Sequence, residues 1–189
     1  MRNTYKLGSL FFGSSLLVAS LTGCVTVNSR PGDNDMPGMN HGSSHSMYIT
    51  DKQSFAAAMI PHHQQAIDMS SYAKTNTSNT EVLALAAKIT SEQGPEIEQM
   101  MPWLEGKTVD YMMMMDGMLS PMQLSTLRAS KDADFDKLYI QYMVQHHEGA
   151  IKMAADALKV NDQELTDFAN EIIATQSAEI EELMSLLNN

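Results

Sequence analysis

The feature that most constrains the fold of this chain is an internal repeat. Residues 59–69 read MIPHHQQAIDM, and residues 143–153 read MVQHHEGAIKM. Both methionines, both histidines, the alanine and the isoleucine coincide at one offset of 84 residues, which carries His62 onto His146. A repeat at a fixed offset indicates two copies of one supersecondary unit.

A second pair of segments repeats at the nearly equal offset of 83 residues. The matching residues are Gln93, Glu96, Ile97 and Met101 in the first copy and Gln176, Glu179, Ile180 and Met184 in the second. Each copy therefore pairs a His-His segment with a following Gln-x-x-Glu segment. We interpret the copies as two αα-hairpins related by a pseudo-two-fold axis, which makes the two His-His helices neighbours.

The rest of the chain fits an all-α fold, a four-helix bundle made of these two duplicated αα-hairpins and a long crossover. Ala, Met, Leu, Glu and Gln dominate its second half, and all are good helix formers. Capping and turn residues predict helices at about 51–73, 82–104, 130–160 and 163–187 within a bundle domain of residues 51–189. Residues 105–130 form the crossover. Pro61 and Pro95 fall inside the first two helices and either kink them or mark nearby starts.

Methionine and histidine share one stripe of each His-His helix. At 100° per residue, the residues at relative positions 1, 4 and 11 of the repeat lie on one face, and the second histidine flanks it. A metal ion could take ligands from two such faces. The candidate ligands are Met59, His62, His63 and Met69, with Met143, His146, His147 and Met153. The alternative is a packed core, because methionine at helical spacing usually fills gaps.

The ligand types favour copper among the metals. Thioether with imidazole suits Cu(I) first, Cu(II) is possible, and zinc is less favoured. Calcium and magnesium prefer oxygen ligands. A di-iron bundle carries Glu-x-x-His on its helices, and no glutamate here lies three residues before a histidine.

The first residues predict export. Residues 1–23 combine Arg2 and Lys6 with a short apolar stretch, as a signal peptide does. The sequence Leu21-Thr22-Gly23-Cys24 resembles the bacterial lipobox, which predicts lipidation of Cys24, the only cysteine. An ordinary signal peptide or an uncleaved anchor is the alternative. Val25 follows this cysteine, at the position where an aspartate would retain a lipoprotein at the inner membrane of Gram-negative bacteria. By resemblance to that sorting rule, Val25 predicts the outer membrane, facing the periplasm.

Two further segments carry soft-metal ligands. Residues 24–50 are rich in Gly, Pro, Ser and Asn and predict a flexible tether. The secondary candidates are Met36, Met39, His41, His45 and Met47 in the tether, and Met112, Met113, Met114 and Met115 in the crossover. The alternative interpretation of the tether is a polar linker of biased composition with no metal site. The methionine run is either a buried part of the crossover or a second loop that binds a soft metal.

The net charge narrows the partners. A formal charge of −11 argues against nucleic acid and against electrostatic attraction to anionic lipid. Membrane attachment would therefore depend on the lipid anchor.

The repeated segments MIPHHQQAIDMS and MVQHHEGAIKMA, with Gln93, Glu96-Ile97, Gln176 and Glu179-Ile180, resemble the family of bacterial domain of unknown function 305 over about residues 50–187. The resemblance implies a ferritin-like four-helix bundle. Some exported members bind copper in the periplasm, which implies that the Met and His residues of the repeat are ligands.

Together these observations predict a non-enzymatic, lipid-anchored protein of the cell envelope that sequesters copper or hands it over. Its expected partners are the metal ion, the membrane, and a metal-handling protein or a second copy of the chain. The alternatives are an interaction module with a Met/His-packed core and a cuprous oxidase, for which no catalytic constellation is visible.

Overall fold

The computed structural model describes residues 48–110 and 115–187, and in this part of the chain every regular element is a helix. The elements are α1 (Lys52–Asn76), α2 (Thr80–Met100), the 3-10 helix η1 (Met101–Leu104), α3 (Pro121–Ala129), α4 (Asp132–Ala157) and α5 (Gln163–Leu187). The all-α prediction is confirmed. Among the described helices, none is long and apolar enough to cross a lipid bilayer.

The helix ends follow from local sequence. Asp51 begins α1 with a capping box in which its side chain accepts from the Ser54 N–H, and Asn79 caps α2. Pro61 and Pro95 both lie inside helices that continue through them. The α-helical pattern stops at Met100, and the chain tightens into η1, which has Pro102 in its first turn.

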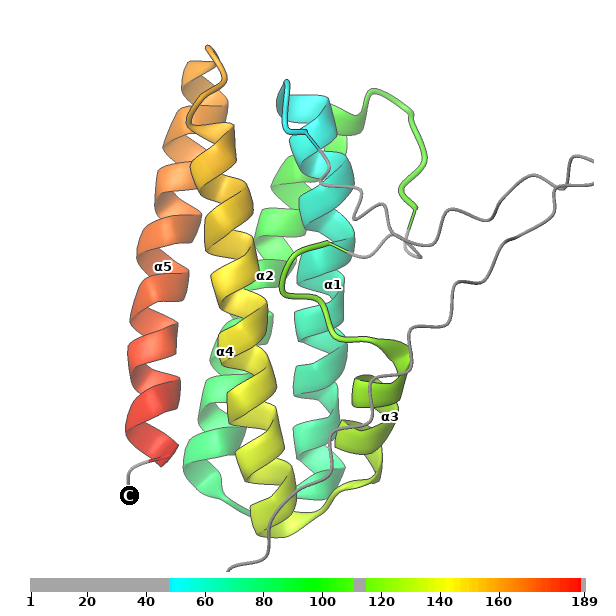
Figure 1. Ribbon diagram of the computed structural model, residues 1–189, viewed down its shortest axis with the longest axis vertical. Helices are drawn as coiled ribbons and strands as arrows, with labels where there is room; N and C mark the ends of the chain where they lie inside the picture. The colour runs from blue at the N-terminus through cyan, green and yellow to red at the C-terminus, as the bar shows by residue number, and fades with distance from the viewer. Residues whose placement is uncertain (1–47, 111–114, 188–189) are drawn as a thin grey trace, which may run out of the picture. The chain divides into compact units, whose positions relative to one another are not determined.

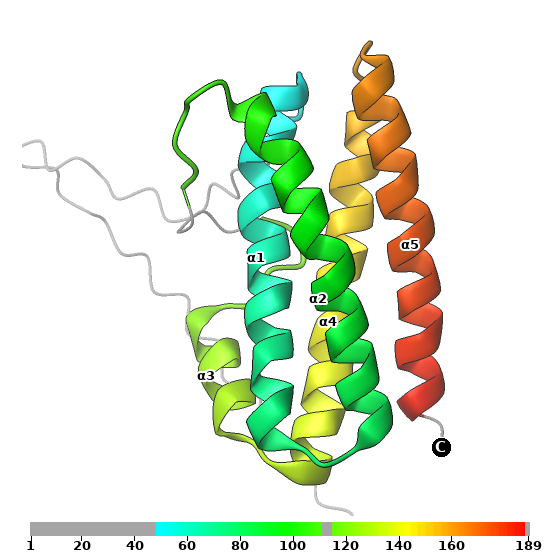
Figure 2. The ribbon, with the colours of Figure 1, turned by 180° about the vertical axis from the view of Figure 1, so that it is seen from behind.

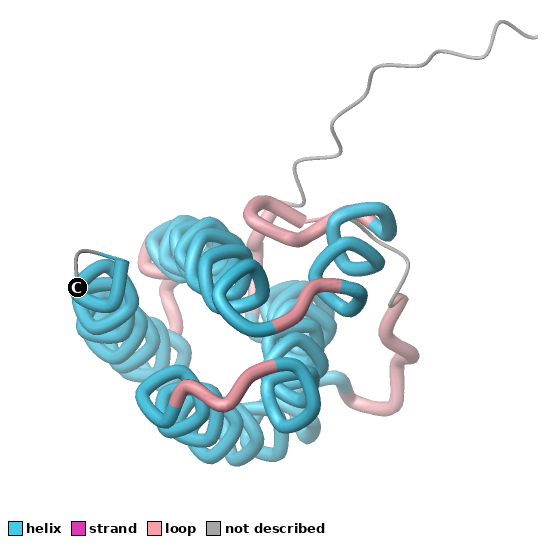
Figure 3. Tube along the Cα trace, turned by 90° about the horizontal axis from the view of Figure 1, so that it is seen from below, coloured by secondary structure: helices cyan, strands magenta, loops and turns pink. Residues whose placement is uncertain are grey.

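The four long helices form two antiparallel hairpins, α1–α2 and α4–α5, packed as a bundle (Figure 1). The view along the bundle places α1 beside α4, with the short helix α3 outside the ring of four (Figure 3). The predicted neighbourhood of the two His-His helices is confirmed. The two helices run in opposite directions, because α4 returns along the path that α1 took.

The crossover differs from the prediction of one long connection over residues 105–130, because it contains α3. Its signal was present in the sequence: Ser120 and Gln123 form a capping box, and Pro121 occupies the first turn. Ahead of α3, the crossover runs across the face formed by α1 and α4 (Figure 1).

The two copies of the repeat hold the crossover differently at one equivalent position. In α1, Gln65 makes two hydrogen bonds to the backbone of Leu119: its amide donates to the carbonyl at 3.1 Å and its oxygen accepts from the N–H at 2.7 Å. In α4 the corresponding residue is Gly149, against which Gly117 packs backbone to backbone. Gly117 has a φ of +82°, which favours glycine. This position breaks the two-fold symmetry.

The apolar core has two parts. The Trp103 cluster contains three aromatic side chains, Phe55, Trp103 and Phe168, and five methionines, Met59, Met100, Met115, Met118 and Met153. The Tyr139 cluster contains Phe135, Tyr139, Met69 and Met143 with several leucines. Histidines occupy the level between these clusters on α1 and α4.

Candidate metal centre

All four histidines of the repeat are completely buried. The rings of His62 and His146 touch between α1 and α4, with centroids 3.8 Å apart and planes inclined at 40°. His146 and His147 have ring centroids 6.3 Å apart. The first histidine of each pair therefore meets its counterpart, while the second histidine points toward the other helix of its own hairpin.

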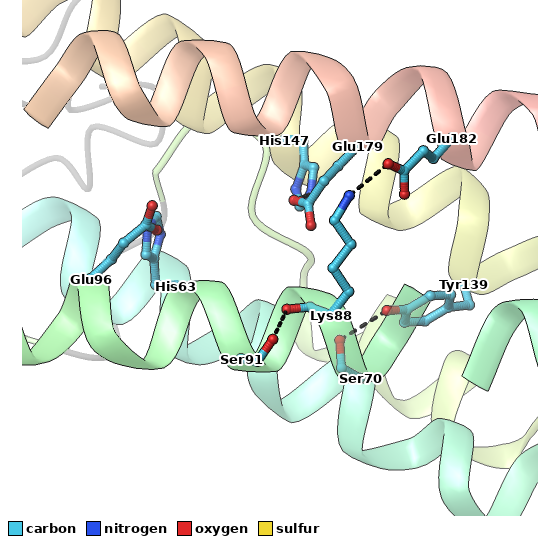
Figure 4. Close-up of polar contacts among 9 residues, drawn as sticks. All are labelled: His63, Ser70, Lys88, Ser91, Glu96, Tyr139, His147, Glu179 and Glu182. Carbon is cyan, nitrogen blue, oxygen red and sulfur yellow. Dashed lines mark hydrogen bonds and ion pairs between the residues drawn. The ribbon is translucent and has the colours of Figure 1, made fainter. Parts of the chain in front are cut away.

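Three of these histidines are anchored by an oxygen atom. His62 Nε2 lies 3.0 Å from the backbone carbonyl of Asp116 in the crossover, which can only accept. His63 Nε2 lies 2.7 Å from Glu96 Oε2, and His147 Nε2 lies 2.8 Å from Glu179 Oε2. Figure 4 shows the His–Glu pairs of the two hairpins.

An anchored Nε2–H leaves a lone pair on the opposite ring nitrogen. With carbonyl and carboxylate acceptors, His62, His63 and His147 carry the proton on Nε2, so that Nδ1 is a free donor to a metal. The Nδ1 atoms of all three are buried and have no hydrogen-bond partner among the described residues. Metal-binding histidines are oriented by such partners on their second nitrogen.

Burial keeps the imidazoles of His62, His146 and His147 neutral. It lowers the pKa of His62 and of His147 to about 3, and it lowers the pKa of His146 well below its usual value. The neighbouring histidines also lower these pKa values, because a positive charge on one ring would repel a positive charge on the next. Neutral imidazole is the form that binds a metal.

The central layer concentrates unsatisfied polar atoms. Of the 12 buried side-chain nitrogen and oxygen atoms that lack a hydrogen-bond partner in the described part of the chain, only Asp136 Oδ1 lies outside it. The others belong to His62, His63, His146 and His147, and to Glu92, Gln93, Gln176 and Glu179. Of these, the carboxyl groups of Glu92 and Glu179 can still hydrogen-bond to each other through a shared proton. Folded proteins leave few such groups unpaired, and those that remain indicate a role. This concentration makes the layer the candidate site.

Carboxyl groups border the histidines on the side of α2 and α5. Burial and then the neighbouring Glu179 raise the pKa of Glu92 to about 7, and burial raises the pKa of Glu179. A polar groove of about 330 Å³ opens beside them and is lined in part by Glu92, Glu96 and Glu171. Figure 2 shows the α2 and α5 side of the bundle, which is opposite the crossover.

Sequence analysis did not assign these carboxylates to the site. Glu96 and Glu179 were visible as repeated residues, and the repeat of Gln-x-x-Glu beside His-His was the available signal. Glu92 has Thr175 at the equivalent position, so the repeat could not identify it.

The methionines do not surround the histidines as one shell. Because α1 and α4 are antiparallel, Met59 lies with Met153 in the Trp103 cluster, and Met69 lies with Met143 in the Tyr139 cluster. Met115 of the crossover is buried in the Trp103 cluster. That cluster also contains Met100 and Met118, which sequence analysis did not name.

The remaining predicted sites lie outside the described residues: Cys24, Met36, Met39, His41, His45, Met47, Met112, Met113 and Met114. Within residues 48–110 and 115–187, no three His, Cys, Asp or Glu side chains already enclose a point in the way that metal ligands do. The described donors are instead arranged in pairs.

Comparisons with known proteins agree with this architecture. The family model described as "Domain of unknown function (DUF305)" matches residues 52–187. A DUF305 protein from Streptomyces coelicolor, described as secreted, has a TM-score of 0.66 and 27% identity, covering 73% of this chain and 93% of that one. Among curated proteins, none matches the chain.

CopM is also similar and has been solved in several metal-bound forms. Its Cu(II)-bound form has a TM-score of 0.63 and 32% identity, covering 75% of this chain and 99% of that chain. Its Cu(I)-bound form has a TM-score of 0.63 and 31% identity, covering 75% and 98%.

Proposed function

The chain belongs to the DUF305 family, and from this premise we propose that it is an exported, lipid-anchored protein that binds copper and sequesters it or hands it over in the cell envelope, without catalysing a reaction. The similarity to CopM, which binds Cu(I) and Cu(II), supports copper as the metal. The predicted signal peptide and lipobox support export and anchoring.

The observation that carries the proposal is the contact between His62 and His146. Two neutral imidazoles meet in a fully buried position, and three of their four ring nitrogens have no hydrogen-bond partner among the described residues. Leaving such atoms unpaired costs about 1–3 kcal/mol each. Coordination of a metal ion would remove that cost.

The methionine clusters supply the soft ligands. Thioether sulfur favours Cu(I), and the Trp103 cluster brings five buried methionines to one end of the bundle, directly beside the histidine layer. We propose Cu(I) as the preferred ion, shared between methionine and the first histidine of each repeat.

A titration with Cu(I) against a chromogenic competing chelator, under anaerobic conditions, tests the proposal. The double variant His62→Leu/His146→Leu keeps an apolar volume and removes the donors, so we expect Cu(I) affinity to fall at least about 10-fold. Met122→Leu is the matched control, because Met122 is 79% exposed on α3 and should not contribute.

Trp103 provides a second readout, because it is the only tryptophan and lies in the methionine-rich cluster. Copper bound there should quench its fluorescence. An unchanged affinity in the histidine variant would move the site to the Met and His residues of positions 36–47. Absence of Cu(I) binding by the wild type would instead favour an interaction module.

The lipid anchor has its own test. We expect cells to incorporate labelled palmitate into the wild-type protein, and the variant Cys24→Ser to lose the label completely, because no other cysteine can replace it. The amount of protein per cell, measured by immunoblot, controls for expression. An unlabelled wild type would contradict the anchor.

A further inference from the structure

The two histidine rings that meet between α1 and α4 cannot share a metal ion in the positions that they occupy. Their centroids lie 3.8 Å apart with planes inclined at 40°, so the rings pack against each other. A metal ion binds an imidazole in the plane of the ring, on the lone pair of a nitrogen. Rings packed in this way direct their lone pairs to different points. At least one of the two, His62 or His146, has to turn before both can bind the same ion.

The two rings are held differently. His62 Nε2–H donates to the backbone carbonyl of Asp116 at 3.0 Å. Neither ring nitrogen of His146 has a hydrogen-bond partner among the described residues. The backbone carbonyl of His62 lies near the His146 ring, but within α1 this carbonyl accepts from the helix itself. A turn of His62 therefore breaks a buried hydrogen bond, and a turn of His146 breaks none in this part of the chain.

This difference arises from the crossover, because the repeat makes the two histidines equivalent in their helices. The crossover runs across the α1/α4 face (Figure 1). Three contacts with α4 hold its Asp116 carbonyl in place: Gly117 packs on the backbone of Gly149, the Gln145 amide donates to the Gly117 carbonyl at 3.2 Å, and the Lys152 ammonium pairs with the Asp116 carboxylate. Helix α4 thus fixes, through the crossover, the acceptor that anchors a histidine of α1.

The surroundings of His146 allow its ring to turn. Side chains of an α-helix lean toward the preceding turn, where Met143 lies three residues before His146. Met143 is buried in the Tyr139 cluster. Methionine is unbranched and flexible, so it can change its rotamer and make space for a moving ring. The backbone of α4 does not have to move.

We propose that the crossover gives the two histidines different roles: His62 is the fixed ligand, which binds through Nδ1 while Asp116 holds Nε2, and His146 is the ring that turns to admit and release the ion. Asp116 and Gly149 are positioning residues, which act through His62 and do not touch the ion. The inference rests on the copper site proposed above. A histidine with a partner on its second nitrogen keeps its orientation when the ion leaves, so the site stays half assembled.

Nuclear magnetic resonance of the full-length, metal-free protein with 15N-labelled histidine tests the anchoring without copper. The variants His62→Gln and His146→Gln assign the two rings. We expect His62 to show a sharp N–H resonance on Nε2 and no ring motion. The His146 ring should show exchange on the microsecond-to-millisecond scale in relaxation dispersion. Equal motion of the two rings, or a His62 proton on Nδ1, would overturn the inference.

The same spectra are then recorded with Cu(I), which is diamagnetic and leaves the resonances visible. We expect the His62 Nε2–H to persist, its Nδ1 resonance to shift, and the exchange of His146 to stop as its ring becomes a ligand. Loss of the His62 N–H with an unmoved His146 would keep the copper site and overturn the assignment of the moving ring. Cu(I) that shifts neither ring would reject the copper site itself, whereas the metal-free spectra would still decide the anchoring.

Two variants test the positioning by the crossover, with circular dichroism to confirm their folding. Gly149→Ala places a Cβ atom 2.0 Å from the Asp116 carbonyl oxygen, so His62 should gain the motion of His146. Its Cu(I) affinity should fall at least about 10-fold.

If Gly149→Ala does not fold, Gln145→Leu/Lys152→Met removes two contacts of the crossover at exposed positions of α4. Motion of His62 should become measurable, and Cu(I) affinity should fall at least about threefold. Lys159→Met is the matched control, because this exposed lysine just after α4 bonds to Asp156. A rigid His62 and an unchanged Cu(I) affinity in the double variant would show that the crossover does not position the ligand.

Discussion

Replacement of Gly149 by alanine is expected to destabilise the protein by about 3 kcal/mol or more, at the upper end of the cost of overpacking. A Cβ atom at this position would lie 2.0 Å from the carbonyl oxygen of Asp116 and 2.6 Å from the Cα of Gly117. Both are backbone atoms, so a side-chain rotation cannot relieve the clash. The crossover would have to lift from α4, which would also break the hydrogen bond from His62 to Asp116.

Urea unfolding followed by circular dichroism measures this effect, and Gly94→Ala is the matched control. Gly94 is also helical, but a Cβ there has nothing within 4 Å. Alanine has a higher helix propensity than glycine, but the following Pro95 disfavours a helical residue with a side chain before it. We therefore expect Gly94→Ala to raise the free energy of unfolding by about 0 to 1 kcal/mol. Equal free energies of unfolding for Gly149→Ala and wild type would contradict the packing of the crossover on α4.

Acidification is expected to unfold the metal-free protein. The pKa values of His62 and His147 in the folded state, about 3, lie below the ordinary value of 6.5. Between these values the unfolded chain binds protons that the folded chain does not. These histidines therefore contribute their full stabilisation above pH 6.5, and this contribution is lost as the pH falls toward 3. Between pH 7 and pH 5, each histidine lowers the free energy of unfolding by about 2 kcal/mol.

The carboxyl groups oppose this loss only in part. The pKa of Glu92 is raised to about 7, so the folded state holds a proton there that the unfolded state releases, and stability rises as pH falls below 7. Glu92 is partly exposed, which reduces this contribution. Glu179, whose pKa is also raised, acts in the same direction as Glu92. His146 adds to the loss. We expect a net decrease of several kcal/mol between pH 7 and pH 5.

Urea unfolding at pH 7, 6 and 5 measures this decrease. The variant His62→Leu/His146→Leu lacks two of the buried histidines and should depend less on pH than the wild type. A free energy of unfolding that stays constant between pH 7 and pH 5 would show that the buried histidines are already compensated.

The repeat, together with capping and turn residues, predicted the four long helices and the neighbourhood of α1 and α4. An offset shared by His62 and His146 implies equivalent helices, and the structure places their rings in contact. This inference needs only helical periodicity and duplication, both of which are local properties of the sequence.

The grouping of the ligands could not be predicted in the same way. Whether Met59 lies near Met153 or near Met143 depends on the relative direction of α1 and α4, which results from how the two hairpins pack. The role of Glu96 and Glu179 depends on the register within each hairpin, which places a carboxylate 2.7 Å and 2.8 Å from a histidine. In the sequence, Gln65 and Gly149 are an ordinary difference between the two copies of the repeat. Their role follows only from the structure, in which the crossover packs against both residues.

The position of the crossover also determines which side of the bundle a partner can cover. Duplication gives the bundle two equivalent sides, but the crossover covers the α1/α4 side and leaves the α2/α5 side exposed (Figures 1 and 2). The groove beside Glu92 and Glu96 opens on that side, away from the crossover. A protein that docked over α2 and α5 would cover this groove without any change in the fold.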